Sequence, residues 1–351
     1  MRLQTPAKIS TIAFLDDRAV FSDAGPIYSA DKSKNIVHPR RSGPFLRPKN
    51  SPRSRSTPNE GGSGVLRSKS KAKVKLGPPA AFWIIFHMVA PEPIAIYPDL
   101  RGRVALVTGA GRSGGIGAAI CRAFADQGCN VFFTYRSVGN LQDADEESER
   151  NYAARLLSDL RGRGVGSECV GIDLAAARSA DMLLGRVYET FGALSILINN
   201  AAHSTLDGFE TLDAEGLDVH YFVNVRAAAL LSVGFAKRFS ERTGGRIINL
   251  TSGQDLGPMP GELAYAASKG AIAALTRSLA KGVAHKGITV NAVDPGPTDT
   301  GWMTPELKAQ LLAESSFGRV GQPHDAASLI VFLASKAGEW ITGEVIHSRG
   351  I

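Results

Sequence analysis

A serine, a tyrosine and a lysine in the C-terminal half of the chain have the types and spacing for chemistry on a carbonyl group. Tyr265 and Lys269 are four residues apart, so a helix would place both side chains on one face. Ser252 precedes the tyrosine across a segment rich in glycine and proline, which is typical of a loop. A hydroxyl, a phenol and an ammonium group held together can bind a carbonyl oxygen and give it a proton. Chance also produces this spacing on solvated helix faces, so the surrounding elements must decide.

Short apolar runs alternate with helical patterns around these residues. The predicted strands cover residues 103–108, 130–135, 164–174, 194–202 and 246–252, and the predicted helices cover about 118–127, 146–163, 177–191, 215–240 and 262–284. This alternation favours an α/β fold with one doubly wound parallel sheet of the Rossmann type and helices on both faces. Ligands of such a sheet bind at the carboxyl ends of its strands, and Ser252 ends one of them.

The first predicted strand runs into a glycine-rich segment, residues 109–117, that opens the first predicted helix. Glycines let the backbone approach phosphate groups, and a helix N-terminus offers unpaired N–H donors to them. In this strand–loop–helix–strand setting the segment predicts a site for the pyrophosphate of a dinucleotide, and a structural turn is the alternative.

The end of the second predicted strand indicates which dinucleotide is bound. A site for NAD usually has a carboxylate there for the ribose hydroxyl, but residues 134–137 contain no acid. Arg136, together with Arg112 in the glycine segment, has the chemistry to pair with a 2′-phosphate. We therefore predict a preference for NADP(H), with NAD(H) as the alternative cofactor. For Arg136 a solvated charge at the strand end is the competing interpretation.

The basic character of the chain is confined to its N-terminal part. Residues 1–100 carry 16 Lys and Arg against 7 Asp and Glu, whereas the remaining residues carry 24 and 26. Nucleic-acid binding is therefore not expected of the predicted sheet domain. Three cysteines, Cys121, Cys129 and Cys169, are too few and too scattered for a disulfide framework or a zinc site. We expect reduced thiols, no metal and a cytoplasmic location.

Within residues 1–98, the stretch from Ser29 to about Lys75 is rich in Ser, Pro, Gly, Lys and Arg and shows no lasting apolar periodicity. Such a segment cannot bury enough apolar surface to offset its ordering entropy, so we predict a disordered basic extension before a single domain at 99–351. The apolar run 80–90 is too short to span a bilayer. We hypothesise that the native protein begins at Met88. An intact mass that includes residues 1–87 would refute this.

Seven motifs in order give residues 99–351 a resemblance to the short-chain dehydrogenase/reductases, and within them to the 3-oxoacyl-acyl-carrier-protein reductases. The motifs are the Thr108–Gly117 loop, Asp173-Leu174, Asn199-Asn200-Ala201, Asn224, Ser252, Tyr265-x-x-x-Lys269 and Asp-Pro-Gly-Pro-Thr-Asp-Thr at 294–300. The chain departs from the family twice. The loop has five residues between Gly109 and Gly115, which makes it longer than usual, and the usual Asn-Asn-Ala-Gly is here Asn-Asn-Ala-Ala.

The resemblance implies catalytic roles for four residues. Tyr265 would protonate the carbonyl oxygen, Ser252 would orient that oxygen, Lys269 would support the phenol and hold ribose hydroxyls, and Asn224 would hold a water that connects Lys269 with solvent. A free tyrosine has a pKa of about 10, so action near pH 7 requires a fall of about three units. Because burial raises a phenol's pKa, we expect Lys269 and the positively charged oxidised nicotinamide to supply this fall.

The glycine segment and the resemblance together give a set of expected cofactor contacts: Gly109, Gly111, Arg112, Gly115, Ile116, Gly117, Arg136, Asp173, Leu174, Asn199, Ala201, Tyr265, Lys269, Pro295, Gly296 and Thr298. Within this set the resemblance implies an adenine contact for Asp173, for which a turn or cap role is the alternative. It implies for Asn199 that the residue fixes the central strand and the adenosine ribose. It places residues 295–298 over the nicotinamide carboxamide and the pyrophosphate.

We therefore expect an NADP(H)-dependent enzyme that reduces a carbonyl, a 3-oxoacyl thioester or related ketone, to a secondary alcohol, or the reverse. The alternative is a non-catalytic NADP(H)-binding or sensing protein on the same fold, with the basic extension as an interaction arm. Nucleic-acid binding by that extension is a minor third interpretation. The resemblance implies a homodimer or homotetramer through residues 215–240 and 262–284, and a mobile substrate lid at residues 298–318. No membrane partner is expected.

Overall fold

The computed structural model describes residues 96–139 and 144–350. The predicted basic extension therefore falls almost wholly outside the described residues, as does the hypothesised start at Met88.

Seven parallel strands form one sheet in the order β3-β2-β1-β4-β5-β6-β7. The strands are β1 (Val104–Val107), β2 (Asn130–Arg136), β3 (Ser167–Ile172), β4 (Ile196–Asn199), β5 (Gly245–Leu250), β6 (Ile288–Asp294) and β7 (Val345–His347). The predicted α/β fold with a doubly wound parallel sheet is confirmed. The strand order reverses between β1 and β4, and such a reversal opens a crevice at the carboxyl ends of the two strands.

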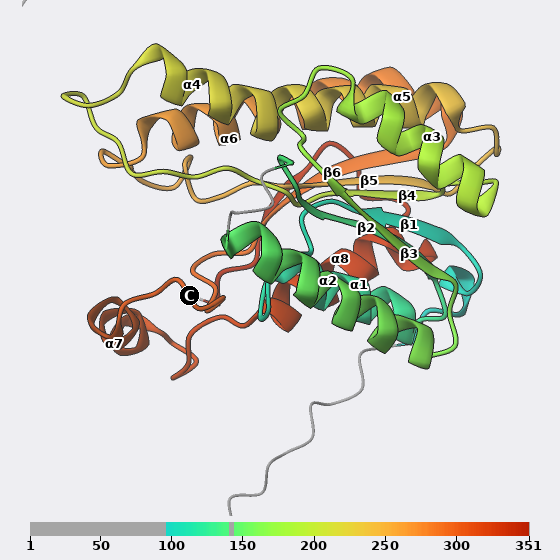
Figure 1. The fold of residues 1–351 in the computed structure, drawn as a ribbon, viewed down its shortest axis with the longest axis horizontal. Coiled ribbons are helices and arrows are strands. Elements are labelled where there is room, and N and C mark those ends of the chain that lie inside the picture. The colour runs from blue at the N-terminus through green and yellow to red at the C-terminus, as the bar shows by residue number, and fades with distance from the viewer. Residues whose placement is uncertain (1–95, 140–143, 351) are drawn as a thin grey trace, which may run out of the picture. The chain divides into compact units, whose positions relative to one another are not determined.

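Helices cover both faces of the sheet (Figure 1). The α-helices are α1 (Ile116–Asp126), α2 (Ala144–Gly162), α3 (Ser179–Phe191), α4 (Ala214–His220), α5 (Ala228–Arg238), α6 (Leu263–Val283), α7 (Pro305–Glu314) and α8 (Pro323–Ala334). Helices α3, α4, α5 and α6 lie on one face, and α1, α2 and α8 lie on the other, while α7 stands at the edge of the molecule (Figure 1). Short 3-10 turns occur at η1 (Pro98–Leu100), η3 (Ala284–Lys286) and η4 (Lys336–Gly338).

Each face of the sheet has its own hydrophobic core, because successive side chains of a strand point to opposite faces. In β1, Val104 and Leu106 belong to the core beneath α3, α5 and α6, whereas Ala105 and Val107 belong to the core that includes residues of α1, α2 and α8. Each of these β1 residues is no more than 5% exposed. Burial on both faces explains why the strands read as continuous apolar runs.

The predicted helix at 215–240 is one helical run that changes its winding in the middle. Between α4 and α5 lies a π-helical segment, η2 (Tyr221–Ala227), which contains Asn224. A π-helical segment leaves the usual hydrogen-bond ladder and is frequent at functional sites. Within the described residues, the stretch Ala214–Arg238 is the one helix with the length and apolarity of a membrane span, and 44% of its most apolar window is buried inside the fold.

Candidate active site

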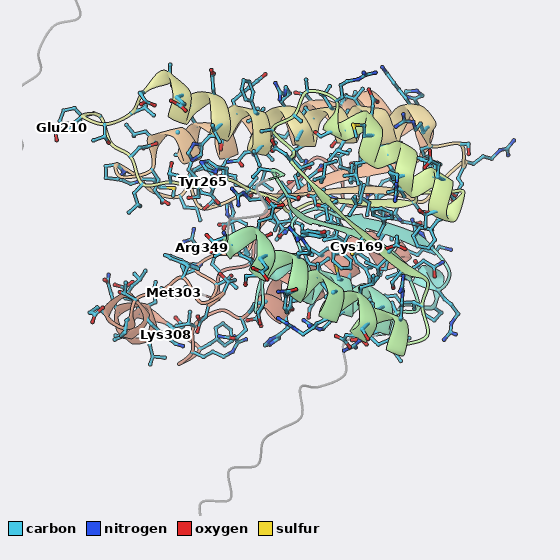
Figure 2. The ribbon with its side chains drawn as sticks, in the orientation of Figure 1. Cys169, Glu210, Tyr265, Met303, Lys308 and Arg349 are labelled. Atoms are coloured by element: carbon cyan, nitrogen blue, oxygen red, sulfur yellow. The ribbon has the colours of Figure 1, made fainter. Side chains whose placement is uncertain are left out.

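A cavity of about 950 Å³ lies where the strands end. Its walls come from the loops after β1, β2, β3, β4, β5 and β6, together with part of α7 and the C-terminal tail. Tyr265 and Arg349, which both line it, lie at the end of the molecule that carries Met303 and Lys308, away from Cys169 (Figure 2). All the predicted cofactor residues line this cavity except Asn199 and Lys269, and Ser252 lines it as well.

The glycine segment packs against the end of β4 too closely for any side chain. A Cβ atom at Gly109, where φ is +73°, would lie 2.7 Å from the Cα atom of Ala201. A Cβ atom at Gly117 would lie 2.4 Å from the carbonyl oxygen of Gly109. Helix α1 begins at Ile116, and within the described residues no side chain caps its first N–H groups. Open N–H donors beside a bare backbone fit the pyrophosphate of a dinucleotide.

Asn199 and Asn200 are adjacent at the end of β4 but have different surroundings. The amide nitrogen of Asn199 donates to Ser232 at 3.0 Å and to Asn249 at 2.8 Å, and the residue is 7% exposed. Asn200 instead lines the cavity, and its amide nitrogen donates to the carbonyl oxygens of Thr108 and Gly109. The structure therefore does not bring Asn199 to the cavity: it ties β4 to β5 and α5, while Asn200 holds the glycine segment.

Asp173 and Thr298 line the cavity and also stabilise their own loops. The Asp173 carboxylate accepts the N–H of Ala175 at 2.8 Å. Asp173 therefore stabilises its own turn and also lines the cavity. The Thr298 hydroxyl donates to the carbonyl oxygen of Gly296 at 3.1 Å. These bonds fix the loops that a cofactor would contact.

The start of α6 fixes Tyr265. The carboxylate of Asp207, from the loop before α4, accepts the N–H of Leu263 and, at 3.1 Å, that of Ala264. These donors belong to the first turn of α6 and have no partner within the helix. Asp207 therefore anchors the helix one residue before Tyr265, and this anchor was not found in the sequence analysis.

Lys269 lies one turn beyond Tyr265 but not in the cavity wall. The residue is 3% exposed, and its Nζ atom donates to the carbonyl oxygen of Leu250 at 2.8 Å. The same Nζ atom is 5.4 Å from the centre of the Tyr265 ring. The ammonium group is thus held between the end of β5 and the phenol, which suits electrostatic support of a phenolate, and the expected ribose contact stays a prediction.

The chain's own groups raise the pKa of Tyr265 to about 12, in the direction expected of burial, and the fall that we expect with the oxidised nicotinamide bound stays a prediction. Burial is the largest cause, and the carboxylates of Glu262 and Asp294 add to it, while a hydrogen bond with Ser252 acts in the opposite direction. Burial also lowers the pKa of Lys269 to about 8. Because a buried charge is disfavoured for both groups, the phenol keeps its proton at neutral pH.

Asn224 connects η2 with the loop that follows β4. It is 3% exposed, its Oδ1 atom accepts the N–H of His203 at 2.7 Å, and its Nδ2 atom donates to the His203 carbonyl oxygen and to Ser268, each at 2.9 Å. His203 lines the cavity directly after Ala202, which stands where the family has glycine. The Asn224 side chain thus holds His203 and α6, and the water that we expect this residue to hold stays a prediction.

Replacement of Asn224 by alanine should destabilise the fold by about 3 kcal/mol, because it removes three hydrogen bonds of a buried side chain and leaves the half-buried backbone groups of His203 without this partner. Urea denaturation measures this change. The matched control is Asn151→Ala on the exposed side of α2, which should change the free energy of unfolding by less than about 0.5 kcal/mol. Equal effects of the two substitutions would contradict the role of Asn224.

Charged residues of opposite sign meet at the end of β2. Arg112 and Arg136 line the cavity, as predicted, and Glu149 of α2 lies between them. Its Oε2 atom accepts the backbone N–H of Arg136 at 3.0 Å, and its Oε1 atom is 3.6 Å from Nε of Arg112. Glu149 was not predicted from the sequence, because no motif marks it.

A second missed group is the C-terminal tail. Arg349 lines the cavity, and its guanidinium donates to the buried carboxylate of Asp294 at 3.2 Å. His347 reaches the same carboxylate oxygen at 2.9 Å. A Cβ atom at Gly253, next to Ser252, would clash with Arg349. The tail thus braces the loops after β5 and β6.

The predicted lid contains α7, which buries none of its residues. Trp302 lines the cavity, is 61% exposed, and donates through its indole N–H to the carbonyl oxygen of Thr298 at 3.0 Å. Leu307 and Leu311 of α7 also line the cavity, whereas Met303 and Phe317 of the same predicted lid do not. The segment therefore presents an apolar wall opposite the loops at the strand ends.

Comparison with known proteins gives consistent matches over this domain. Residues 109–350 match the family model described as enoyl-(acyl carrier protein) reductase. An uncharacterized oxidoreductase, YjdA of Bacillus subtilis, is 50% identical over 250 residues, which are 71% of this chain and 96% of that protein. The NADPH-dependent aldehyde reductase-like protein, chloroplastic, of Arabidopsis thaliana is 36% identical over 72% of this chain and 94% of its own.

The same domain resembles solved structures. The crystal structure of a blue fluorescent protein from a metagenomic library, in complex with NADPH, has a TM-score of 0.65 and 32% sequence identity. The match covers 72% of this chain and 98% of that one.

Proposed function

Because this chain belongs to the short-chain dehydrogenase/reductase family, we propose that it is an NADP(H)-dependent enzyme that reduces a carbonyl to a secondary alcohol, or catalyses the reverse reaction. The observation that supports this most strongly is that one cavity brings together Ser252, Tyr265 and the glycine segment. The oxidoreductase class follows from the family.

The residues present fit a dinucleotide. The bare backbone at Gly109 and Gly117, the uncapped start of α1 and the two arginines at the end of β2 form a cradle that side chains would otherwise fill. When bound, the reduced nicotinamide supplies the hydride for the carbonyl carbon. The metagenomic blue fluorescent protein was solved in complex with NADPH, and the plant relative is named as NADPH-dependent. Both support NADP(H) as the cofactor.

In the proposed reduction Tyr265 gives its proton to the carbonyl oxygen, and the Ser252 hydroxyl donates a hydrogen bond that orients this oxygen. A phenol with a pKa of about 12 is protonated at neutral pH and is ready to donate. Ionisation of that phenol at pH 7 costs roughly 7 kcal/mol in the protein alone. The ammonium group of Lys269 is placed to lower this cost, since its Nζ atom lies 5.4 Å from the ring centre.

The pH dependence follows from the same two groups. The pKa of Lys269 is about 8 and that of Tyr265 about 12, so the ammonium group loses its proton first as the pH rises. For reduction, which needs both protons in place, kcat/KM for NADPH should therefore be level below pH 8 and fall above it. Initial rates at saturating carbonyl substrate measure this. A profile that stays level well beyond pH 8 would contradict the role of Lys269.

A substrate panel tests the proposed function directly. Aldehydes, ketones and 3-oxoacyl thioesters are offered with NADPH or NADH, and secondary alcohols with the oxidised cofactors. We expect turnover of at least one carbonyl class, and the loss of NADPH absorbance measures it. Tight binding of NADP⁺ without turnover of any class would instead support the non-catalytic sensing protein.

We also propose that the chain forms a homo-oligomer through the outer face of α4, η2 and α5. Leu217, Tyr221 and Leu230 expose 41%, 53% and 45% of their surface along this helical run. Exposed apolar side chains at helical spacing are typical of an interface. Light scattering on the purified protein tests this, and a monomer at micromolar concentration would refute it.

A further inference from the structure

The corner of the cavity at the end of β2 contains an acid where the sequence indicated only bases. Glu149 has a side chain that is 12% exposed, and it pairs with Arg112, whose side chain is 82% exposed. Its other carboxylate oxygen accepts the N–H of Arg136, thirteen residues before it in the chain. The carboxylate is therefore fixed by contacts from both arginine-bearing segments.

Glu149 also lies directly against the glycine segment. A Cβ atom built on Gly111 would be 2.4 Å from Oε2 of Glu149 and 2.7 Å from Cβ of Tyr135. Gly111, Arg112, Tyr135, Arg136 and Glu149 all line the cavity. In a dinucleotide-binding sheet, the junction of the glycine loop with the end of the second strand receives the adenosine ribose.

The two nicotinamide cofactors differ at this corner in charge and in hydrogen bonding. NAD(H) presents a ribose 2′-hydroxyl, which can donate to a carboxylate. NADP(H) presents a 2′-phosphate, which is an anion and accepts hydrogen bonds. The Glu149 carboxylate therefore favours the first and repels the second. It also occupies Arg112, one of the two guanidinium groups that a 2′-phosphate would use.

We propose that Glu149 determines the cofactor preference of this protein: it weakens the binding of NADP(H), stabilises that of NAD(H), and lets the chain use both. This inference rests on the proposed function as a nicotinamide-dependent oxidoreductase. The acid that normally reads the ribose hydroxyl follows the second strand directly. Here the acid at this corner is Glu149 of α2. Its carboxylate offsets the attraction of the two arginines for a 2′-phosphate.

Calorimetric titration of Glu149→Gln with NADP⁺ and with NAD⁺ tests the proposal without any substrate. Glutamine keeps the shape and an acceptor oxygen for the Arg136 N–H, so the local fold is retained. We expect NADP⁺ to bind at least tenfold more tightly and NAD⁺ to bind two- to fivefold more weakly than in the wild type. The ratio of kcat/KM for NADPH over NADH should rise by a similar combined factor.

Glu147→Gln is the matched control. Glu147 lies two residues away on α2, is exposed and does not line the cavity, yet its replacement changes the net charge by the same amount. Both dissociation constants should stay within twofold of the wild type. If Glu149→Gln shifted the NADP⁺/NAD⁺ ratio no more than this control does, or lowered it, the inference would be wrong.

Arg112→Gln gives an independent check, because its exposed side chain contributes little to folding. Without its partner the Glu149 carboxylate is unopposed, so NADP⁺ should bind at least tenfold more weakly, with NAD⁺ unchanged or tighter. In the double variant with Glu149→Gln this loss should be several-fold smaller, and an undiminished loss would overturn the inference. If wild-type protein bound neither dinucleotide, the proposed function itself would be wrong. If both dinucleotides bound but the ratio of their dissociation constants did not change in Glu149→Gln, only the inference about Glu149 would be wrong.

Discussion

Replacement of Tyr265 by phenylalanine should lower kcat for carbonyl reduction by about 10³-fold and leave the dissociation constant of NADP⁺ within about twofold. The substitution removes only the hydroxyl that would give its proton to the carbonyl oxygen. The ring remains in the first turn of α6, beside the ammonium group of Lys269. Steady-state kinetics with the substrate found in the panel, and calorimetry with NADP⁺, measure the two quantities.

Tyr188→Phe on α3 is the control for this experiment. The pKa of Tyr188 is also raised by burial, but the residue does not line the cavity, so its hydroxyl should be dispensable for turnover. Activity of Tyr265→Phe equal to that of the control would show that another group donates the proton, and the proposed mechanism would then be wrong.

Replacement of Lys269 by methionine should abolish turnover and stabilise the fold. The pKa of Lys269 is about 8 in the folded protein against 10.5 as its ordinary value, because burial disfavours the ammonium group. Below pH 8 the buried ammonium group lowers the stability of the folded state by its full free-energy cost. This cost disappears as the pH rises toward 10.5. The shift corresponds to about 3 kcal/mol at pH 7, and loss of the hydrogen bond to Leu250 offsets roughly 1 kcal/mol of it.

Urea denaturation at two pH values measures the predicted change in stability. We expect Lys269→Met to exceed the wild type in free energy of unfolding by about 2 kcal/mol at pH 7, and to lose that advantage near pH 10. Lys281→Met on the exposed side of the same helix is the control, and it should change stability by less than about 0.5 kcal/mol at either pH. A pH-independent difference for Lys269→Met would show that the ammonium group is not destabilised by burial.

The positions of the strands and of the glycine segment were predictable because each depends on local sequence. Buried parallel strands must be apolar over several residues, as at 130–135, and a backbone that approaches phosphate closely must be glycine, as at Gly109. The order of these elements was enough for the doubly wound sheet. The same local reasoning predicted that Ser252 and Tyr265 would meet, because strand ends and following helices converge at one edge of such a sheet.

Side-chain direction at the strand ends was not predictable. Asn199 and Asn200 are adjacent, and a shift of one residue along a strand moves a side chain to the opposite face. The register of β4 against β5, which pairs Asn199 with Asn249, turns Asn199 toward α5 and leaves Asn200 for the cavity. No composition or spacing in the sequence distinguishes these two asparagines.

The sequence by itself determined the fold class and the glycine-rich segment, and it indicated the side chains that we propose as reactive, because these follow from residue type and local spacing. Only the tertiary structure decided the pKa values and the charge pairs of the site, because these depend on which distant segments meet. Burial together with Glu262 and Asp294 raises the pKa of Tyr265. In the same way, α2 brings Glu149 to the two arginines. The sequence indicated these arginines but not the acid beside them.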